Sequence, residues 1–420
     1  MHPLLNFAHD VLPFTKNWPD WILYGSLVFI VAFGILNTLV APLTGISTYI
    51  ERRLAGRAQY RWGPNRVGFR SMLDALPITR GIAKLGDMQP FKFIGSKIPG
   101  GLLQFAADGL KLFTKEDIIP AQADQLLFRG APYVILAGSF AAFAVLPVSF
   151  HFRAVNLNIG IFYILGISSI VVPGILMAGW GSANKWALLG GMRAAAQIIS
   201  YEIPVAIALM TAVMLAGTMN MADIVETQRS GYGMEKAGML GWYAFRYGGL
   251  MLVPFVIYFI GGCAEVNRTP FDLVEGESEL VAGYHTEYSG FRWSFFFMAE
   301  YSNMFAVGAI ATTMFLGGPL PPYPVQFTES LFGPMGNLGM VLRFGEGFFW
   351  FFAKSYFFVL LMIHMRWTLP RYRIDQMMHL CWKVLIPIGL VWFVLMCGVK
   401  MVRMEMALPP EKDAVAEVHK

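Results

Sequence analysis

Carboxylates gather in one short stretch of a chain that carries few charges elsewhere. The segment EVNRTPFDLVEGESEL, residues 265–280, directly follows a long apolar run. Its five acids are Glu265, Asp272, Glu275, Glu277 and Glu279. Crowded acids repel one another, and poor solvation disfavours their ionised form further, so such groups can take up and release protons near neutral pH. The chemistry that this stretch suggests is proton transfer.

Spacing divides these acids into groups. In a helical register the acids at 272, 275 and 279 share one face and the acid at 277 points elsewhere, whereas Glu265 can pair with Arg268, three residues further on. Residues 265–292 contain six acids against two arginines, an excess that an anionic bilayer surface would repel. A solvated acidic loop is one interpretation. Interleaved residues such as Phe271 and Tyr284 favour the other, a loop folded against protein.

Two more acids lie inside apolar segments. Glu300 falls within the run 293–317, and an ionisable group placed deep in a membrane costs about 2.5–3.5 kcal/mol even on a lenient insertion scale. Such groups usually mark ion or proton pathways. Glu202 lies at the start of the run 201–217, where it is equally suited to be a favourable neighbour of a helix N-terminus. With the acids of the loop, Glu202 and Glu300 would form a carboxylate relay.

Arginines follow the first apolar run. In YIERRLAGRAQYRWGPNRVG, residues 49–68, three of them recur at i, i+4 and i+8 before Gly63 and Pro64 end the helix. The arginines of this segment are Arg52, Arg53, Arg57, Arg61 and Arg66. They can anchor the helix to anionic lipid headgroups, or they can form the rim of a cavity that opens to the lipid, and composition does not decide between the two.

A second amphipathic helix is predicted in LLQFAADGLKLFTKED, residues 102–117. Its polar face would consist of Gln104, Asp108, Lys111 and Lys115. Apolar residues cover the rest, so the helix should lie in the membrane surface rather than cross it. Between the two helices, residues 69–99 show no strong period and predict an added surface element. Residues 45–130 as a whole are expected to form an amphipathic segment on one side of the membrane.

The elements that must position these side chains are membrane helices. Hydrophobic residues make up 56% of the chain and charged residues 14%, against roughly a quarter charged in soluble domains. A spanning helix needs about 20 mostly apolar residues. Eight stretches qualify, namely 21–43, 131–150, 157–180, 201–217, 247–264, 293–317, 347–365 and 384–399. Around the last stretch, Lys383 and Lys400 can lay their stems along the helix while their ammonium groups stay in water.

The predicted fold class is therefore an all-α integral membrane protein, with eight transmembrane helices plus amphipathic interfacial helices in a single membrane domain over residues 1–420. Basic residues concentrate after the first, third and seventh stretches, which predicts that these segments are cytoplasmic and that both termini face outward. The N-terminal residues lack the basic start and apolar core of a cleavable signal peptide. The net charge of +5 reflects this asymmetry and does not call for nucleic acid.

Cysteine and histidine usage bears on redox chemistry. The three cysteines, Cys263, Cys381 and Cys397, contain no CxxC pair, and the seven histidines form no HExxH motif. No glycine-rich phosphate loop is present either. The sequence therefore predicts a chain that binds no redox cofactor of its own, covalently or by motif.

Six segments in order give the chain a family resemblance. They are ERRLAGRAQYRWGPNRVG, GLLQFAADGLKLFTKEDIIP, MRAAAQIISYEIP, AEVNRTPFDLVEGESELVAGYHTEYS, FFMAEYSNM and PRYRIDQMMHLCWKVLIP. They resemble the successive signature segments of the H-subunit family of bacterial NADH:quinone oxidoreductase, respiratory complex I, and are similar throughout to mitochondrial NADH dehydrogenase subunit 1. The chain departs from the family pattern at residues 69–99 and in the long segments around 219–246 and 319–346.

The resemblance implies a membrane subunit that anchors the peripheral redox arm in the bacterial cytoplasmic membrane, with both termini in the periplasm. It would form most of a quinone tunnel, for ubiquinone or menaquinone, with Phe271 and the five arginines of residues 49–68 at the quinone. Its carboxylate path, over Glu202, the acids of residues 265–280 and Glu300, would lead toward antiporter-like pumping subunits. FMN and iron–sulfur clusters would be held by partner subunits, and small membrane subunits and lipid would be further partners.

Two other functions remain open from the sequence. A homologous membrane subunit of a membrane-bound hydrogenase would share the fold and the acids but need no quinone tunnel. A proton-coupled transporter would be expected to show an internal inverted repeat with broken helices in matching halves, and the sequence shows no such repeat.

Overall fold

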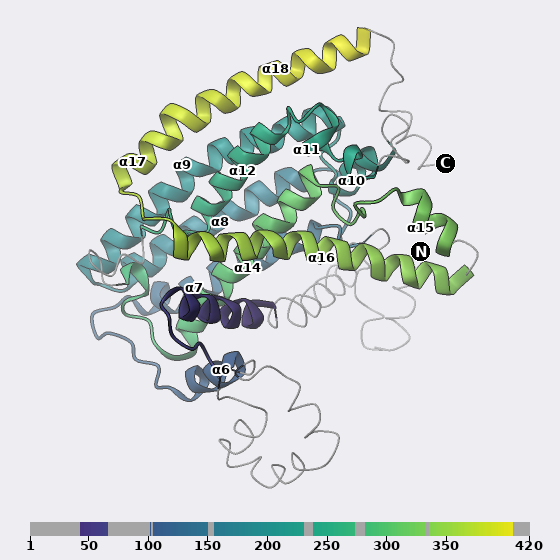
Figure 1. The fold of residues 1–420 in the computed structure, drawn as a ribbon. Coiled ribbons are helices and arrows are strands. Elements are labelled where there is room, and N and C mark those ends of the chain that lie inside the picture. The colour runs from purple at the N-terminus through teal and green to yellow at the C-terminus, as the bar shows by residue number, and fades with distance from the viewer. Residues whose placement is uncertain are drawn as a thin grey trace, which may run out of the picture.

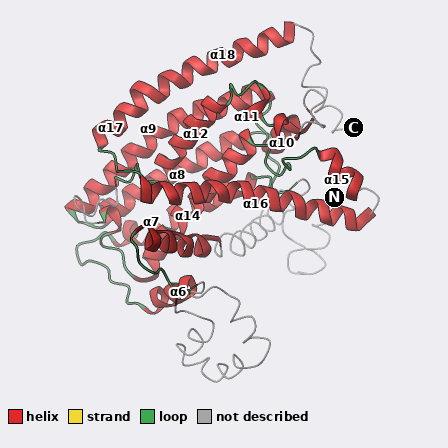
Figure 2. Ribbon diagram, in the orientation of Figure 1, coloured by secondary structure: helices red, strands yellow, loops and turns green. Residues whose placement is uncertain are grey.

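In a computed structural model the chain is described over residues 43–65, 101, 104–149, 155–230, 238–273, 282–332 and 336–405. Every regular element within these ranges is a helix and none is a strand, so the all-α prediction is confirmed for the part of the chain that is described (Figures 1 and 2). The first apolar stretch, apart from residue 43, and the added element at 69–99 lie outside the described residues.

The helices differ widely in length. The long ones are α7 (Gln125–Ala141), α8 (Gly160–Gly181), α9 (Lys185–Ala216), α12 (Leu252–Glu265), α14 (Gly290–Phe315), α16 (Gly336–Thr368) and α18 (Ile386–Glu405). The short ones are α6 (Gln104–Thr114), α10 (Met221–Ser230), α11 (Tyr243–Arg246), α15 (Val325–Phe332) and α17 (Ile374–His379). A further helix covers residues 43–58. It is the purple helix in Figure 1.

Five of the eight predicted spans are confirmed by length and hydropathy among the described residues. They are Gln125–Val145, Gly160–Gly181, Lys185–Ala216, Leu342–Thr368 and Ile374–Val402. At the predicted span 247–264 the helix α12 is apolar but only 14 residues long. At 293–317 the helix α14 has 26 residues but is not apolar enough to be counted with the five. The chain is thus an integral membrane protein whose total number of spans the described residues do not fix.

Local sequence signals explain where the central helices begin and end. The Asp124 side chain accepts hydrogen bonds from the backbone N–H groups of Leu126 and Leu127, at 3.0 and 3.3 Å, and so caps the N-terminus of α7. Asn184 caps α9 in the same way through the N–H of Trp186. At the other end of α9 the chain turns at Gly217, whose φ of 76° suits a residue without a Cβ.

Helix α9 lies at the centre of the bundle, in contact with α8, α12 and α18, and α14 lies against α7, α12 and α16 (Figure 1). Small residues allow the closest approach, because a Cβ added at Gly191 would lie 3.3 Å from the Cα of Gly179 in α8. Tyr201 of α9 and Phe315 of α14 are completely buried in the largest apolar core. The side chains that α8, α9, α12 and α14 turn toward one another therefore lie inside protein.

Two lysines bind backbone carbonyls at the C-terminal ends of α9 and α14. The Nζ of Lys400 in α18 donates to the carbonyl oxygens of Met214 and Leu215, in the last turn of α9. The Nζ of Lys354 in α16 likewise donates to Leu316 and Leu320 after α14, at 2.7 and 2.8 Å. Free carbonyls and the helix dipole make a helix C-terminus a favourable partner for a cation.

The Lys400 ammonium group thus binds a neighbouring helix, a contact that the prediction did not include, and its side chain remains half-exposed. Lys383, at the other end of the same span, is exposed as predicted. It lies in a π-helical turn, Leu380–Leu385, which joins α17 to α18. Pro387 explains the wider turn, since its ring would clash with the carbonyl of Lys383 in a regular α-helix and it has no N–H to donate.

Candidate functional site

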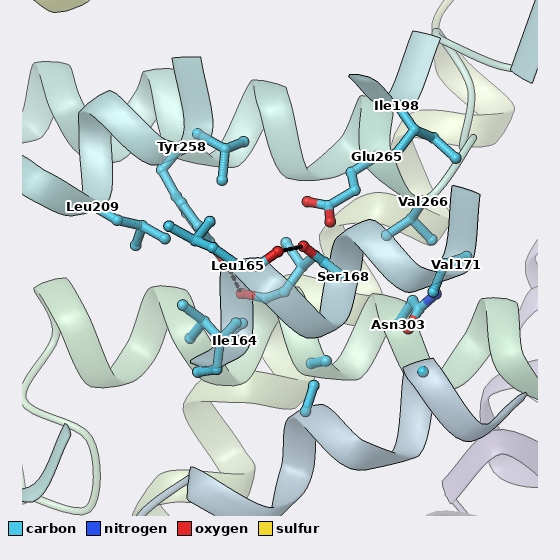
Figure 3. A pocket seen from close by; sticks show the side chains of 16 residues that line it. Ile164, Leu165, Ser168, Val171, Ile198, Leu209, Tyr258, Glu265, Val266 and Asn303 are labelled. Carbon is cyan, nitrogen blue, oxygen red and sulfur yellow. Dashed lines mark hydrogen bonds between the residues drawn. The ribbon is translucent and has the colours of Figure 1, made fainter. Parts of the chain in front are cut away.

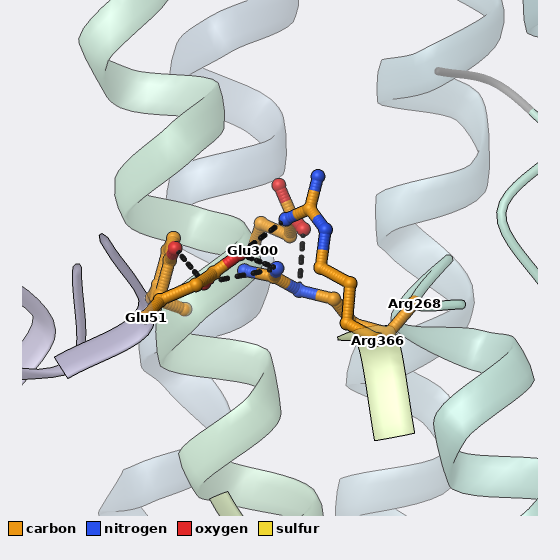
Figure 4. A network of polar contacts seen from close by, with 5 residues as sticks. Glu51, Arg268, Glu300 and Arg366 are labelled. Atoms are coloured by element: carbon orange, nitrogen blue, oxygen red, sulfur yellow. Dashed lines mark hydrogen bonds and ion pairs between the residues drawn. The ribbon is translucent and has the colours of Figure 1, made fainter. Parts of the chain in front are cut away.

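Two acids and two arginines from distant parts of the chain meet in one buried network (Figure 4). Glu51 comes from the helix at 43–58, Arg268 from the turn after α12, Glu300 from α14 and Arg366 from α16. Arg268 Nη1 lies 3.1 Å from Glu51 Oε1, and its Nε lies 2.8 Å from Glu300 Oε1. Arg366 Nη1 lies 2.6 Å from Glu51 Oε1.

Burial makes this network a costly arrangement unless its charges balance. The side chains of Arg268 and Glu51 are only 2% and 8% exposed. Tyr301 adds a short hydrogen bond from its hydroxyl to Glu51, and its ring lies 4.5 Å from the guanidinium carbon of Arg268. Two carboxylates thus face two guanidiniums, and removing one member would leave an uncompensated buried charge.

The pairing of opposite charges in this network keeps Glu51 and Arg268 ionised. Burial alone would raise the pKa of Glu51, but the charges of Arg268 and Arg366, with the hydrogen bond from Tyr301, hold that pKa below its usual value. Burial would lower the pKa of Arg268, and the charges of Glu300 and Glu51 outweigh it and raise the pKa further. Glu51 and Arg268 are therefore fixed charges at physiological pH.

A second cluster brings two acids together beside a cavity. Glu265, at the end of α12, lines a cavity of about 50 Å³ between α7, α8, α9, α12 and α14 (Figure 3). It lies close enough to Glu202 of α9 for the two charges to repel. Ser169 of α8 makes a short hydrogen bond to Glu202, and Ser168 lines the cavity beside Glu265. None of the residues that line the cavity is lysine, arginine or histidine.

The predicted pairing of Glu265 with Arg268 is therefore wrong. The chain does not continue as an α-helix beyond Glu265 but turns, with the Arg268 N–H bonded to the Cys263 carbonyl at 3.2 Å, and this turn directs the guanidinium toward Glu51 and Glu300. The expected helical spacing i, i+3 does not exist at that point. Glu300, predicted as a member of the carboxylate relay, forms an ion pair with Arg268.

The remaining acids of the predicted relay are only partly visible. Asp272 is described and buried, at 8% exposure. Glu275, Glu277 and Glu279 lie outside the described residues. The segment returns at residue 282 and packs against the bundle, where the Tyr288 hydroxyl donates to the Phe128 carbonyl at 3.1 Å and Asn184 donates to Glu287 at 2.6 Å. These contacts support a loop whose C-terminal part is folded against protein.

Phe271, predicted at the quinone, is 4% exposed. Its ring lies between those of Tyr201 and Tyr372, with centroids 5.5 and 5.8 Å away. The buried amide of Gln197 donates to the carbonyls of Phe271 and Ala264, both at 2.7 Å, and ties the end of α12 to α9. In this structure Phe271 packs between two aromatic rings.

The predicted arginine stripe lies at the surface. Arg52 pairs with Asp108 of α6 at 2.5 Å, and Arg53 lies over the ring of Tyr49. Arg57 and Arg61 are exposed. The helix ends at residue 58, before Gly63 and Pro64, so Arg61 is not on it as predicted, and its Nε donates to the Gln59 side chain. Arg66 lies outside the described residues.

Sequence reasoning missed three members of the network, which are Glu51, Tyr301 and Arg366. Glu51 directly precedes the predicted arginines, and a carboxylate beside arginines suggests local pairing. Arg366 belongs to the basic segment that predicts orientation, and nothing nearby in the chain indicates a buried partner. For the two charged members, Glu51 and Arg366, a usable signal was that each follows an apolar run, where a charge is costly unless it finds a partner.

Metal binding finds no support in the visible part of the site. Among the described residues no three His, Cys, Asp or Glu side chains are grouped so that they could hold an ion. The side chains that meet here are carboxylates, hydroxyls and guanidiniums, of which carboxylates and hydroxyls can take up or pass on protons.

Fold and site together define a class, an all-helical integral membrane protein that keeps several charged side chains in its interior. Residues 90–397 match the protein family described as NADH dehydrogenase. The chain is 47% identical over 389 residues to the NADH-quinone oxidoreductase H subunit of Chlorobium luteolum, covering 90% of this chain and 92% of that protein. It is 43% identical over 394 residues to the corresponding protein of Chlorobaculum tepidum, covering 91% and 97%.

A similar relation holds for a bacterium of another genus. The NADH-quinone oxidoreductase H subunit of Bacteroides fragilis is 42% identical over 396 residues, covering 94% of this chain and 96% of that protein. The chain belongs to the family of NADH-quinone oxidoreductase H subunits. The resemblance that its six segments predicted is thereby confirmed.

Proposed function

We propose that this chain is a membrane subunit of a proton-translocating NADH:quinone oxidoreductase, in which it guides quinone and begins the path that couples quinone reduction to proton movement. The observation that carries the proposal is the pair of neighbouring buried clusters, one with balanced charges and one with two unbalanced acids, in a member of the H-subunit family. Ionisable groups inside a membrane protein usually serve ion or proton movement.

The division of labour in the complex follows from the groups present. FMN and iron–sulfur clusters, carried by partner subunits, supply the electrons. Quinone reduction consumes two electrons and two protons, so this chain provides an apolar channel, charges that orient the head group, and acids that respond to the reaction. The five arginines of residues 49–68, with Phe271, are the proposed quinone-side residues.

A change at the quinone can reach the acids through Arg268. The guanidinium is shared between Glu51 and Glu300, and backbone hydrogen bonds at 3.1 and 3.2 Å wind residues 262–268 into one rigid turn that also carries Glu265. A proton taken up or a charge formed near the network alters the hold on Arg268. A shift of Arg268 would then move Glu265 relative to Glu202 and change the repulsion between the two carboxylates.

The proposed surroundings follow the same assignment. The complex lies in the bacterial cytoplasmic membrane, with both termini of this chain in the periplasm. The peripheral-arm iron–sulfur and quinone-site subunits bind on the cytoplasmic side, and small membrane subunits and antiporter-like subunits lie alongside. Asp272 and the acids at 275, 277 and 279 would extend the path from Glu265 toward those pumping partners.

Replacing Glu265 by Gln in the whole complex tests the proposal. The variant keeps shape and polarity but cannot ionise, so we expect assembled complex with normal NADH oxidation by an artificial acceptor and strongly reduced quinone-driven acidification of reconstituted vesicles. Glu346→Gln is the matched control, because Glu346 is a half-buried acid of α16 that is bonded to Tyr323, beyond the far end of α14. Acidification undiminished in Glu265→Gln would refute the proposal.

A further inference from the structure

One side chain of α9 binds both ends of the segment that follows α12. The Nε2 group of Gln197 donates one hydrogen bond to the carbonyl of Ala264 and another to the carbonyl of Phe271, both at 2.7 Å. The segment between these two carbonyls carries Glu265 and Arg268. A single amide therefore closes this segment into a loop that is bound to α9.

Burial and orientation make these two hydrogen bonds specific. Gln197 is only 1% exposed. Both acceptors are carbonyl oxygens, so the NH2 end of the amide must face them, because the flipped amide would bring three oxygens together. The Oε1 atom of Gln197 is also buried and has no hydrogen-bond donor among the described residues. In that part of the chain, no competing donor draws the amide away from the two carbonyls.

Backbone hydrogen bonds make residues 264–271 a compact unit. The Asn267 N–H donates to the Ala264 carbonyl at 3.1 Å, and the Phe271 N–H donates to the Arg268 carbonyl at 2.8 Å. Asn267 has a φ of 55°, a left-handed conformation that is uncommon outside turns. The Ala264 carbonyl thus accepts from the turn and from the glutamine amide together. Hydrogen bonds to α9 at both ends therefore position the whole unit.

Helix α9 also carries the second acid of the cluster beside the cavity. Glu202 lies on this helix after Gln197, and Glu265 directly follows Ala264 in the chain. The two carboxylates are close enough to repel each other, and the repulsion grows as their distance shrinks. The hydrogen bond from Gln197 to Ala264 acts against this repulsion, because it holds the end of α12 on the helix that carries Glu202.

We propose that Gln197 is a positioning residue that holds residues 264–271 on α9 and thereby sets the resting distance between the Glu265 and Glu202 carboxylates. When the hold on Arg268 changes, a unit bound at both ends pivots about the amide as one body, and Glu265 moves with it. Without the amide, a shift of Arg268 would be absorbed by deformation of the segment. The inference rests on the proposed function, in which the movement of Glu265 relative to Glu202 couples quinone reduction to proton movement.

Replacing Gln197 by Met tests the role, because methionine is similar in length and flexible but donates no hydrogen bond. The intact complex would be reconstituted into vesicles, and the ratio of quinone-driven acidification to quinone-dependent NADH oxidation would be measured. We expect this ratio to fall about threefold, near the low end of what single residues contribute to coupling between sites. NADH oxidation by an artificial acceptor reports assembly and should stay at the wild-type level.

The matched control is Gln228→Met, in α10 beyond the C-terminal end of α9. Gln228 is also 1% exposed, and its amide also donates to a backbone carbonyl, that of Thr313, at 2.9 Å. The control therefore loses a comparable buried amide without touching residues 264–271. It should keep the wild-type ratio of acidification to NADH oxidation.

Hydrogen–deuterium exchange in the assembled complex measures the hold on the segment directly. The N–H groups of Asn267 and Arg268 are bonded within the turn, to the carbonyls of Ala264 and Cys263. We expect both to exchange about tenfold faster in Gln197→Met, because the two lost hydrogen bonds no longer oppose local opening. Their exchange should be unchanged in Gln228→Met.

Wild-type exchange in Gln197→Met would overturn the inference. Faster exchange with an unchanged ratio would also overturn it, because the amide would then hold the segment without affecting coupling. If Gln197→Met did not assemble, Gln197→Asn would replace it in both measurements, since its amide is one methylene shorter and cannot reach both carbonyls. In each of these cases the proposed function stands if Glu265→Gln strongly reduces acidification, and it fails if Glu265→Gln is fully active.

Discussion

The two buried clusters, which are joined by the turn 262–268, surround their acids with opposite kinds of partner. Around Arg268 each carboxylate lies against a guanidinium, and Tyr301 adds a hydrogen bond to Glu51. Around Glu265 two carboxylates face each other with serine hydroxyls and a polar cavity, and no cation lines that cavity. The arginines hold the pKa of Glu51 below its usual value and so keep that carboxylate charged, whereas the cavity lining offers Glu265 no cation that would do the same.

The difference assigns distinct tasks to residues that the sequence placed in one relay. The acids that are bound to arginines hold the helix at 43–58, α14 and α16 together through ion pairs. Acids without a cation can change their charge when their surroundings shift. The turn 262–268 belongs to both clusters, because it carries Glu265 at one end and Arg268 at the other. Changes at these positions should therefore differ in kind as well as in size.

The largest effect is expected at Arg268. Arg268→Ala would leave Glu51 with Arg366 alone and Glu300 without its guanidinium, and losing one partner of a buried ion pair costs about 3–5 kcal/mol. We expect the complex to lose this chain, as measured by the amount of assembled complex and its melting temperature. Arg268→Met combined with Glu300→Gln removes charges of both signs and should recover part of the loss. A normal melting temperature for Arg268→Ala would show that the network contributes no stability.

Glutamine in place of each glutamate gives the next effect, with opposite signs in the two clusters. Glu300→Gln gives up a charge-assisted contact with Arg268 and should lower the free energy of unfolding by about 2 kcal/mol. Glu265→Gln removes one of two repelling buried charges and should leave that free energy unchanged or raise it by about 1 kcal/mol. Melting temperatures of the purified complexes measure both. The same sign for both variants would erase the distinction between the clusters.

The sequence predicted the fold class and the family of the protein more accurately than it predicted which charged side chains contact each other. Apolar length and spacing sufficed for five spans, because hydrophobic runs of about 20 residues have few alternatives in a membrane. Composition and six motifs sufficed for the family. The pairing of Arg268 was beyond reach, since its partners are 217 and 32 positions away in the chain and only tertiary packing brings them together.

Predictions from local sequence patterns also failed at single residues, because contacts distant in the chain determine where these residues lie. The helix at 43–58 ends early because the chain turns back at once, with the Arg61 N–H bonded to the Gly56 carbonyl at 2.7 Å. A Cβ at Gly56 would lie 2.8 Å from the Arg61 carbonyl oxygen, so this glycine permits the turn. Lys400 looked like a membrane-surface lysine because the carbonyls that bind it belong to another helix.

A moderate effect is expected for Tyr301→Phe, which removes the hydrogen bond to Glu51 and leaves the ring over Arg268 in place. A hydrogen bond to a charged group is worth about 1.5–3 kcal/mol, and we expect the lower value because two arginines still hold the carboxylate. The control is Tyr163→Phe, where the lost bond is to the neutral Ala141 carbonyl at 3.3 Å. Equal melting temperatures for the two variants would mean that Glu51 gains nothing from Tyr301.

The smallest effect on stability is expected at Arg52, which also faces an acid but does so at the surface. Its side chain is 49% exposed and that of Asp108 is 31% exposed. Water and salt screen such a pair, so Arg52→Ala should change the free energy of unfolding by less than about 1 kcal/mol, far below the change at Arg268.

The quantity to compare is quinone reductase activity at equal amounts of assembled complex, with NADH oxidation by an artificial acceptor as reference. If Arg52 belongs to the quinone rim, activity with quinone should fall several-fold while stability does not. If it serves only as a lipid or helix anchor, both should remain at the wild-type level, and the arginines of this helix would drop out of the proposed quinone path. A large loss of stability in Arg52→Ala would contradict the comparison, because an exposed ion pair would then contribute as much to the free energy of unfolding as a buried one.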